Sequence, residues 1–391
     1  MQTTLNNVIS RIIDYRGKTP LKLGYNWVNN GKYIALSAKN VKTGKLVNLE
    51  SAYHGDEKLY KLWMKEEINR GDILLTSEAP FGQVYFWDSD EKIILSQRLF
   101  CLTPTNIVPQ YLNYYMCSDS FQNELLSRST GSTVTGLRQP ALLACSINVP
   151  NTIVQQHIVG AIGSVDDLIE KESLLLRSLD SFGNKIYETS FSSKNETHYR
   201  LSDLCTFVPG YSYSGNELAE SSTGMVSIKS VERNGGFKSD GIKALCPLKQ
   251  IPSLKMCTTG DVLVAHTDLT KNQDIIGSPI IITTKSNFKQ LTYSMDLVKV
   301  VSNTTSVGNA LLFRILDSPK FKDHALGFCS GTTVVHLSRR ALETFEFDGP
   351  QKGVKELSDR LDAIERQKAE TTRKIEVLKS LKTVLLSKYF N

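Results

Sequence analysis

Two short stretches of the sequence have residue types that phosphate chemistry requires. Gly17-Lys18-Thr19 is similar to the end of a phosphate-binding loop, whose first glycine lies five residues before the second. That region holds Ile12 and Ile13, so the backbone cradle for the phosphates is missing. Gly31-Lys32 fails as well, because Tyr33 follows it where a Ser or Thr is needed. Neither stretch predicts nucleotide binding.

A charged cluster and the histidines offer a second kind of chemistry. Asp88, Asp90, Glu91 and Lys92 resemble the carboxylates and lysine of a nuclease, but a solvated turn before the apolar run 93–95 explains them better. The six histidines are isolated, with no spacing typical of a metal site. The sequence also lacks a dinucleotide-binding glycine motif, a serine-hydrolase elbow and an amino-methyltransferase signature. We therefore expect no catalytic residue, metal or cofactor on this chain.

Composition leaves the class of partner open. The chain has 391 residues, 40% of them hydrophobic, and a net charge of +6. At about 150 residues per domain we expect two or three domains, and the charge permits a nucleic-acid partner without establishing one. No apolar run predicts a membrane span, and the first residues lack a signal-peptide pattern. The seven cysteines form no Cys-x-x-Cys pair, so we expect reduced thiols in a cytoplasmic protein.

The elements that must position any functional residue occur twice in the chain. Four short matches recur in the same order in both halves, at offsets of 189 to 200 residues. They pair Leu5–Val8 with Leu201–Leu204, Ser37–Val41 with Ser227–Val231, Gly71–Leu74 with Gly260–Leu263, and Gly131–Val134 with Gly331–Val334. The sequence therefore predicts a duplicated unit of about 195 residues.

Each repeat begins with a stretch of short apolar runs separated by Gly, Pro and Asn. Runs such as 72–75, 84–87, 262–264 and 280–282 predict strands, and 109–126 predicts helical structure between them. This pattern is typical of a mixed α/β (α+β) globule with a curved sheet. We expect the first globular domain over residues 1–156 and the second over 192–349.

Each repeat ends in a long amphipathic helix, predicted over 157–191 and 350–391. Apolar residues at alternating steps of four and three indicate the seam of a coiled coil. The residues expected to pair the helices are Ile162, Val165, Ile169, Leu176, Leu179, Leu361, Ile364, Ile375 and Leu378. Residues 157–199 carry a net charge of −3 and residues 350–391 one of +4, which favours antiparallel pairing of the two helices with each other. The alternative is that each helix lies independently on its own globule.

This organisation resembles the specificity subunit of type I restriction-modification systems. The resemblance is carried by the duplicated Gly-Asp-Ile-Leu (71–74) and Gly-Asp-Val-Leu (260–263), and by the run from Gly131 through Ile147-Asn148-Val149-Pro150 to Gln155-Gln156-His157-Ile158-Val159. Gln155 stands where the family usually has an acidic residue. The second copy of this run, 331–347, lacks the proline and glutamine portion, and Gly349-Pro350-Gln351 is a degraded version of it.

The resemblance implies a non-catalytic prokaryotic subunit that recognises double-stranded DNA. Two target-recognition domains would each read one half of a split site, and the paired helices would set the spacing between them. It also implies two modification subunits, which carry S-adenosylmethionine and methylate adenine. Motor-nuclease subunits that use ATP and Mg²⁺ would complete the full complex.

Residues that could contact DNA are cations, amides, hydroxyls and aromatics near the repeated motifs. In the first repeat they are Tyr15, Arg16, Lys18, Thr19, Lys39, Asn40, Ser77, Arg98, Ser132 and Thr133. In the second they are Tyr211, Tyr213, Lys229, Ser230, Thr267, Asp268, Lys271, Thr332 and Thr333. Two alternatives stay open: a coiled-coil scaffold whose globules bind proteins rather than DNA, and an autonomous DNA enzyme.

Overall fold

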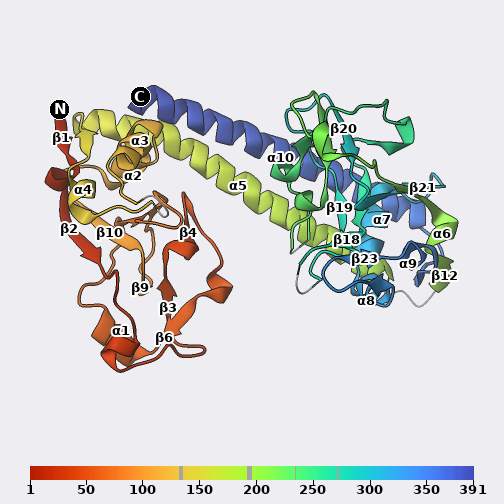
Figure 1. Ribbon diagram of the computed structural model, residues 1–391, viewed down its shortest axis with the longest axis horizontal. Coiled ribbons are helices and arrows are strands. Elements are labelled where there is room, and N and C mark those ends of the chain that lie inside the picture. Colours follow the sequence, from red (N-terminus) through yellow and green to blue (C-terminus); the bar gives the residue numbers. More distant parts are fainter. Residues whose placement is uncertain (132–134, 192–195, 234, 271–272) are drawn as a thin grey trace. The chain divides into compact units, whose positions relative to one another are not determined.

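The computed structural model describes residues 1–131, 135–191, 196–233, 235–270 and 273–391 (Figure 1). The chain forms two compact units. Unit 1 is Met1–Ile169 together with Leu378–Asn391, and unit 2 is Glu170–Val377. Each unit therefore contains a globular part and a segment of each of two long helices, α5 (Thr152–Phe191) and α10 (Val354–Phe390).

Unit 1 contains a four-stranded antiparallel sheet of order β2-β10-β7-β8. A second sheet has the order β6-β3-β9, with β3 and β9 parallel, and β1 pairs with β11. The strands are β1 (Gln2–Thr4), β2 (Ile9–Asp14), β3 (Tyr33–Leu36), β4 (Val41–Lys42), β5 (Lys45–Leu46), β6 (Tyr53–Gly55), β7 (Ile73–Thr76), β8 (Val84–Phe86), β9 (Ile94–Leu95), β10 (Leu99–Pro104) and β11 (Ser146–Asn148). The short helices are α1 (Glu57–Trp63), α2 (Pro109–Met116), α3 (Asp119–Ser127) and α4 (Gln139–Leu143).

The central strands of unit 1 are buried on both faces, which explains their continuous apolar sequence. Ile73 and Leu75 of β7 belong to a core with α2, α3, the start of α5 and the end of α10. The Phe390 ring closes this core, 5.4 Å from the ring centroids of Tyr111 and of Tyr115. Leu74, between the two β7 residues, belongs to a separate core around Trp63. Successive side chains of a strand point to opposite faces of the sheet, so β7 contributes residues to both cores.

Unit 2 repeats this topology. Its four-stranded sheet has the order β13-β21-β17-β19, and a second sheet of order β15-β14-β20-β16 again contains a parallel pair, β14 with β20. The strands are β12 (Glu196–Arg200), β13 (Cys205–Pro209), β14 (Thr223–Val226), β15 (Lys243–Ala244), β16 (Met256–Cys257), β17 (Val262–Ala265), β18 (Thr267–Asp268), β19 (Pro279–Ile281), β20 (Gln290–Tyr293), β21 (Leu297–Ser302), β22 (Cys329–Ser330), β23 (Val335–Leu337) and β24 (Glu346–Pro350). The short helices are α6 (Leu201–Leu204), α7 (Asn309–Leu316), α8 (Pro319–Leu326) and α9 (Arg340–Glu343). The predicted mixed fold and internal repeat are confirmed.

Local capping explains why the stretch 109–126, predicted to be helical, consists of two helices, α2 and α3. The Ser118 hydroxyl accepts the N–H of Phe121 at 3.3 Å and starts α3. In unit 2 the Ser318 hydroxyl accepts the N–H of Phe321 at 3.2 Å in the same way and starts α8. The repeat thus extends to the hydrogen bonds that divide its helices.

The long helices run antiparallel within each unit, as predicted. In unit 1 the ring of His157 lies against that of Tyr389, and Asp166 of α5 pairs with Lys382 of α10 at 2.6 Å. In unit 2, Asp180 pairs with Lys368 at 2.8 Å, and Gly183 lies against Ile364. Both ion pairs join an acidic residue of α5 to a lysine of α10. This agrees with the negative net charge of the first helical segment and the positive net charge of the second.

The helices begin at residues that differ from the predicted ones. α5 begins at Thr152 rather than 157, because the Asn151 side chain accepts the N–H of Val154 at 3.0 Å and caps the helix there. α10 begins at Val354 rather than 350, because β24 extends to Pro350 and Gly353 adopts φ +78°. No helix among the described residues is long and apolar enough to cross a membrane.

Candidate nucleic-acid interface

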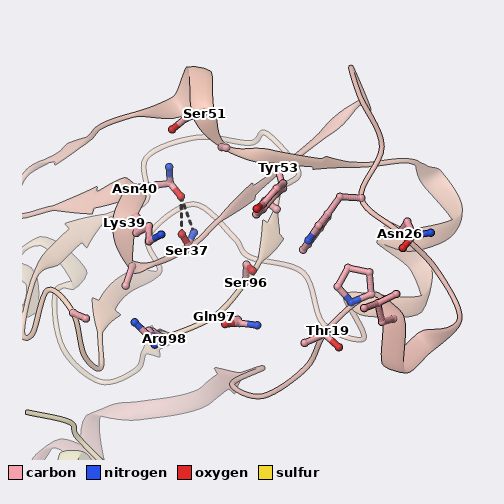
Figure 2. A pocket seen from close by; sticks show the side chains of 17 residues that line it. Thr19, Asn26, Ser37, Lys39, Asn40, Ser51, Tyr53, Ser96, Gln97 and Arg98 are labelled. Atoms are coloured by element: carbon pink, nitrogen blue, oxygen red, sulfur yellow. Dashed lines mark hydrogen bonds between the residues drawn. The ribbon is translucent and has the colours of Figure 1, made fainter. Parts of the chain in front are cut away.

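A hollow of about 680 Å³ in unit 1 gathers polar, cationic and aromatic side chains (Figure 2). It is formed by the ends of β3 and β9 and by the loops around residues 19–27, 51–53 and 79. Figure 2 shows Lys39 and Arg98 at one end, with Thr19 and Asn26 at the other. None of the described residues that line the hollow is an Asp or Glu. The hollow therefore suits an anionic ligand.

Lys39 is held at the tip of a short 3-10 turn, Ala38–Asn40, that follows β3. The Asn40 amide fixes this turn: its oxygen accepts from the N–H and hydroxyl of Ser37 at 3.0 and 2.9 Å, and its nitrogen donates to Asn48 O at 3.1 Å. Asn40 is buried, and its hydrogen-bonding capacity is used inside the fold. Lys39 is exposed, and its ammonium contacts no partner among the described residues. The turn thus presents a free cation to the hollow.

Arg98 lies in the connection between β9 and β10, and its backbone is held in an uncommon conformation. Its φ is +65°, a region that favours glycine, and its carbonyl accepts the N–H of Ser77 at 2.9 Å. The guanidinium Nε lies 3.1 Å from a carboxylate oxygen of Glu78, and the side chain is 46% exposed. Ser77 itself is buried, and its hydroxyl has no hydrogen-bond partner among the described residues. Arg98 reaches the surface, whereas Ser77 supports the backbone beneath it.

Aromatic side chains line another part of the hollow. The Tyr53 ring stacks on Trp27 with a centroid distance of 5.5 Å and an interplanar angle of 5°, and Trp27 packs on Trp63 at 5.4 Å. The Trp63 indole donates to Leu95 O at 2.8 Å, which anchors the stack in the core. Tyr53 is 65% exposed. An exposed ring supported from behind offers the kind of face on which nucleobases stack.

The remaining described candidates of the first repeat brace this region or line it. The Tyr15 hydroxyl accepts the N–H of Lys65 at 3.0 Å. Arg16 pairs with Asp14 and donates to Leu137 O at 2.7 Å. Lys18 donates to Trp63 O at 2.7 Å, and burial, followed by the charge of Lys65, lowers its pKa. Thr19 lines the hollow.

In unit 2 the candidates that follow β14 repeat the arrangement around Lys39. Lys229 lies in a 3-10 turn, Ile228–Ser230, and is exposed, with no partner for its ammonium among the described residues. Ser230 is fully buried, as Asn40 is in unit 1. The Tyr211 hydroxyl donates to Glu217 at 2.8 Å, a bond that raises the pKa of Tyr211. Tyr213 is half-buried.

The other candidates of unit 2 divide between interior and surface. Thr267 and Asp268 are buried in β18, and the Asp268 carboxylate accepts the N–H groups of Thr270, Ile275 and Ile276 at 2.6 to 2.8 Å. Although burial alone would raise it, these bonds hold the pKa of Asp268 below its usual value. This placement argues against direct DNA contact by Thr267 and Asp268, as burial does for Asn40, Ser77 and Ser230. Thr332 and Thr333 are exposed, and Ser132, Thr133 and Lys271 lie outside the described residues.

The residues expected to pair the helices are buried or half-buried. Ile162, Val165, Leu361, Ile364 and Ile375 are buried, and Ile169, Leu176, Leu179 and Leu378 are half-buried. In the part of the chain that the structure describes, no group of three or more His, Cys, Asp or Glu side chains could hold a metal ion. The Asp88 and Asp90 carboxylates both pair with Arg70, so this cluster is an exposed ion-pair network.

Comparison with known proteins relates part of the chain to one family. The model of the type I restriction modification DNA specificity domain matches residues 9–177. The specificity subunit of the type I restriction enzyme MjaVIII from Methanocaldococcus jannaschii is 27% identical over 185 residues, which cover 43% of each chain. That of HindI from Haemophilus influenzae is 26% identical over 133 residues, 32% of this chain and 29% of the relative. The chain is similar to type I specificity subunits over less than half of its length in each of these comparisons. The aligned segments span less than half the length of either curated relative.

A solved structure shares the fold over a longer stretch. The S subunit of a type I restriction-modification system from M. genitalium covers all of this chain and 96% of its own, with a TM-score of 0.59 at 11% identity. The specificity-domain match includes every residue that lines the hollow, since these fall between Thr19 and Arg98. The hollow therefore lies within the family's DNA specificity domain.

Sequence reasoning missed several residues of this site. Asn26, Trp27 and Gln97 line the hollow but lie in irregular segments without a recognisable motif, and Tyr53 lies at the start of the short strand β6. One signal could have identified Gln97: Ser96 and Leu99 match Ser294 and Leu297 at the same spacing. This match places residues 96–98 just before β10 and residues 294–296 just before β21, at equivalent points of the two repeats.

Proposed function

We propose that this protein is the non-catalytic DNA-recognition subunit of a type I restriction-modification complex, each globular part reading one half of a bipartite site. The observation that carries the proposal is that the specificity-domain match encloses a hollow with two cations, stacked aromatic rings and no lining carboxylate. Cations anchor phosphates, and amides, hydroxyls and guanidinium groups read base edges. The repeated topology supports a matching role for unit 2.

The long helices have a separate part in this proposal. A stable antiparallel pair would hold two DNA-reading parts at a fixed spacing, whereas a flexible linker would let the distance between half-sites vary. Two modification subunits carrying S-adenosylmethionine would dock on the globular parts and helices. The restriction subunits would supply ATP- and Mg²⁺-dependent cleavage, so the isolated chain would neither methylate nor cut DNA.

The test measures binding of the full chain, alone and with its co-encoded modification subunit, to labelled duplex DNA over a range of salt concentrations. Affinity should fall steeply with salt, because phosphate contacts release counterions. Lys39→Ala and Lys229→Ala should each weaken binding to all sequences and reduce the slope of log K against log[salt] by about 1. Lys58→Ala, an exposed lysine on α1 that does not line the hollow, is the matched control.

Two results would contradict the proposal. Binding that is absent in both preparations, or insensitive to salt, would favour a scaffold that binds proteins. Methyl transfer or cleavage by the isolated chain with S-adenosylmethionine or Mg²⁺ would instead indicate an autonomous enzyme.

A further inference from the structure

The register of the two sheets makes Arg98 and Asp296 equivalent residues of the two repeats. Leu99 of β10 is the partner of Thr76 in β7, and Leu297 of β21 is the partner of Ala265 in β17. The hydrogen bonds just beyond these pairs also match: Ser77 N donates to Arg98 O at 2.9 Å, and His266 N donates to Asp296 O at 2.8 Å. The two residues therefore occupy equivalent positions in the two repeats.

The neighbouring connections repeat as well. Leu137 N donates to Ser77 O at 3.0 Å, and Leu337 N donates to His266 O at 2.9 Å. Ser96 N donates to Leu36 O at 2.7 Å, and Ser294 N donates to Val226 O at 2.8 Å. Because Leu36 and Val226 end β3 and β14, Lys39 and Lys229, three residues later, are equivalent too.

At some equivalent positions of this surface the two repeats have the same residue type, and at others they have different ones. Lys39 and Lys229 keep an exposed ammonium at one place. Arg98 becomes Asp296, a reversal of charge, and Gln97 becomes the exposed Met295. Phosphate contacts are the same for every sequence, whereas base contacts must differ between two domains that read different half-sites. The kept lysines fit the first role, and the changed pair fits the second.

The structure holds both changed side chains in place. Arg98 keeps a long side chain at φ +65°, where glycine would relieve the strain, and Glu78 orients its guanidinium at 3.1 Å. The Ser294 hydroxyl donates to the Asp296 carboxylate at 3.1 Å, and Asp296 remains partly exposed. A strained backbone at a residue with a long side chain indicates that this side chain has a function.

We propose that residues 98 and 296 determine base specificity: Arg98 reads guanine in one half-site, and Asp296 reads cytosine in the other. Arginine donates two hydrogen bonds to the O6 and N7 atoms of guanine, whereas an aspartate accepts one from the N4 amino group of cytosine. This inference rests on the proposed DNA recognition. It assigns the difference between the two half-sites to a pair of residues of opposite charge.

The test selects bound duplexes from a randomised library with the full chain and its modification subunit, and sequences them. Arg98→Gly removes the reading group while relieving the strained backbone, so it should fold at least as well as the wild type. It should lower the preference for guanine at one position of one half-site about 10- to 100-fold, and leave the other half-site unchanged. Asp296→Asn, nearly the same shape, should lower the preference for cytosine in the other half-site only.

Arg70→Ala is the matched control. Arg70 is also an exposed arginine, but it lies just before β7, whereas Arg98 is hydrogen-bonded to Ser77, just after the other end of that strand. Arg70→Ala should leave both half-sites unchanged. An unchanged motif in Arg98→Gly or Asp296→Asn, with binding retained, would overturn this inference and leave the proposed function standing. Changes in both half-sites from either variant would also overturn it. Loss of DNA binding by the wild type itself would overturn the proposed function, and this inference with it.

Discussion

Replacement of Arg314 by methionine should destabilise unit 2 by about 2 kcal/mol. Arg314 lies in α7, its side chain is only 3% exposed, and its guanidinium pairs with Asp180 of α5 at 3.0 Å and with Glu365 of α10 at 3.1 Å. Removing one partner of a buried ion pair costs about 3 to 5 kcal/mol. Here the cost is lower, because Asp180 is half exposed and Lys368 stays within 3.0 Å of both carboxylates.

The assay for this variant is urea unfolding followed by two signals. All three tryptophans, Trp27, Trp63 and Trp87, lie in unit 1, so tryptophan fluorescence reports that unit, whereas far-UV circular dichroism reports both. Arg314→Met should lower the midpoint of the dichroism transition more than that of fluorescence. In Arg314→Met/Glu365→Gln the loss should be smaller than the sum of the two single losses. A loss below about 0.5 kcal/mol, or strict additivity, would refute the role assigned to this junction.

Four further results are expected. Tyr114→Phe removes the bond of 2.9 Å to Asp166 and should cost about 1 kcal/mol, seen as an earlier fluorescence transition; no shift would contradict this. Burial, then a nearby arginine, lowers the pKa of His266 to about 4, so unit 2 should lose up to about 3 kcal/mol as the pH falls from 7 to 4, and His266→Leu should flatten this dependence of the unfolding free energy. Leu176→Pro, within α5, should lower helix content and broaden the spacing preference between half-sites, whereas an unchanged preference in selected duplexes would refute the spacing role. Cys246, the exposed thiol, should react with a thiol reagent faster than the other six, which are buried or half-buried; several fast thiols would contradict this placement.

The sequence predicted the duplication because a repeated unit leaves matched residues at matched places. Gly71–Leu74 and Gly260–Leu263 do enter equivalent strands, and Lys39 and Lys229 do occupy equivalent turns. The long helices were predictable for a similar reason, since a seam with a seven-residue repeat is a local property of the chain. Only their first residues were misplaced, because a side-chain cap and a strand end determine them.

The candidate site was less predictable, because residue type does not reveal which way a side chain faces. Asn40 and Asp268 have the chemistry of DNA contacts, but their oxygens accept hydrogen bonds that fix their own turns. Trp27 and Tyr53 were missed because their stack joins an irregular segment to the start of β6, 26 residues later. No periodicity links such segments, so only the folded chain brings them together.

The junctions between globular parts and helices bear on how such proteins can be diversified. Tyr114 lies four residues before the capping Ser118, and Arg314 lies four residues before Ser318, so one place in the repeat holds a phenol in one copy and a guanidinium in the other. A globular module grafted onto α5 and α10 would have to supply a group that suits the charges already on those helices. The residue at this place of the repeat would therefore affect how well a globular module packs on a given pair of helices.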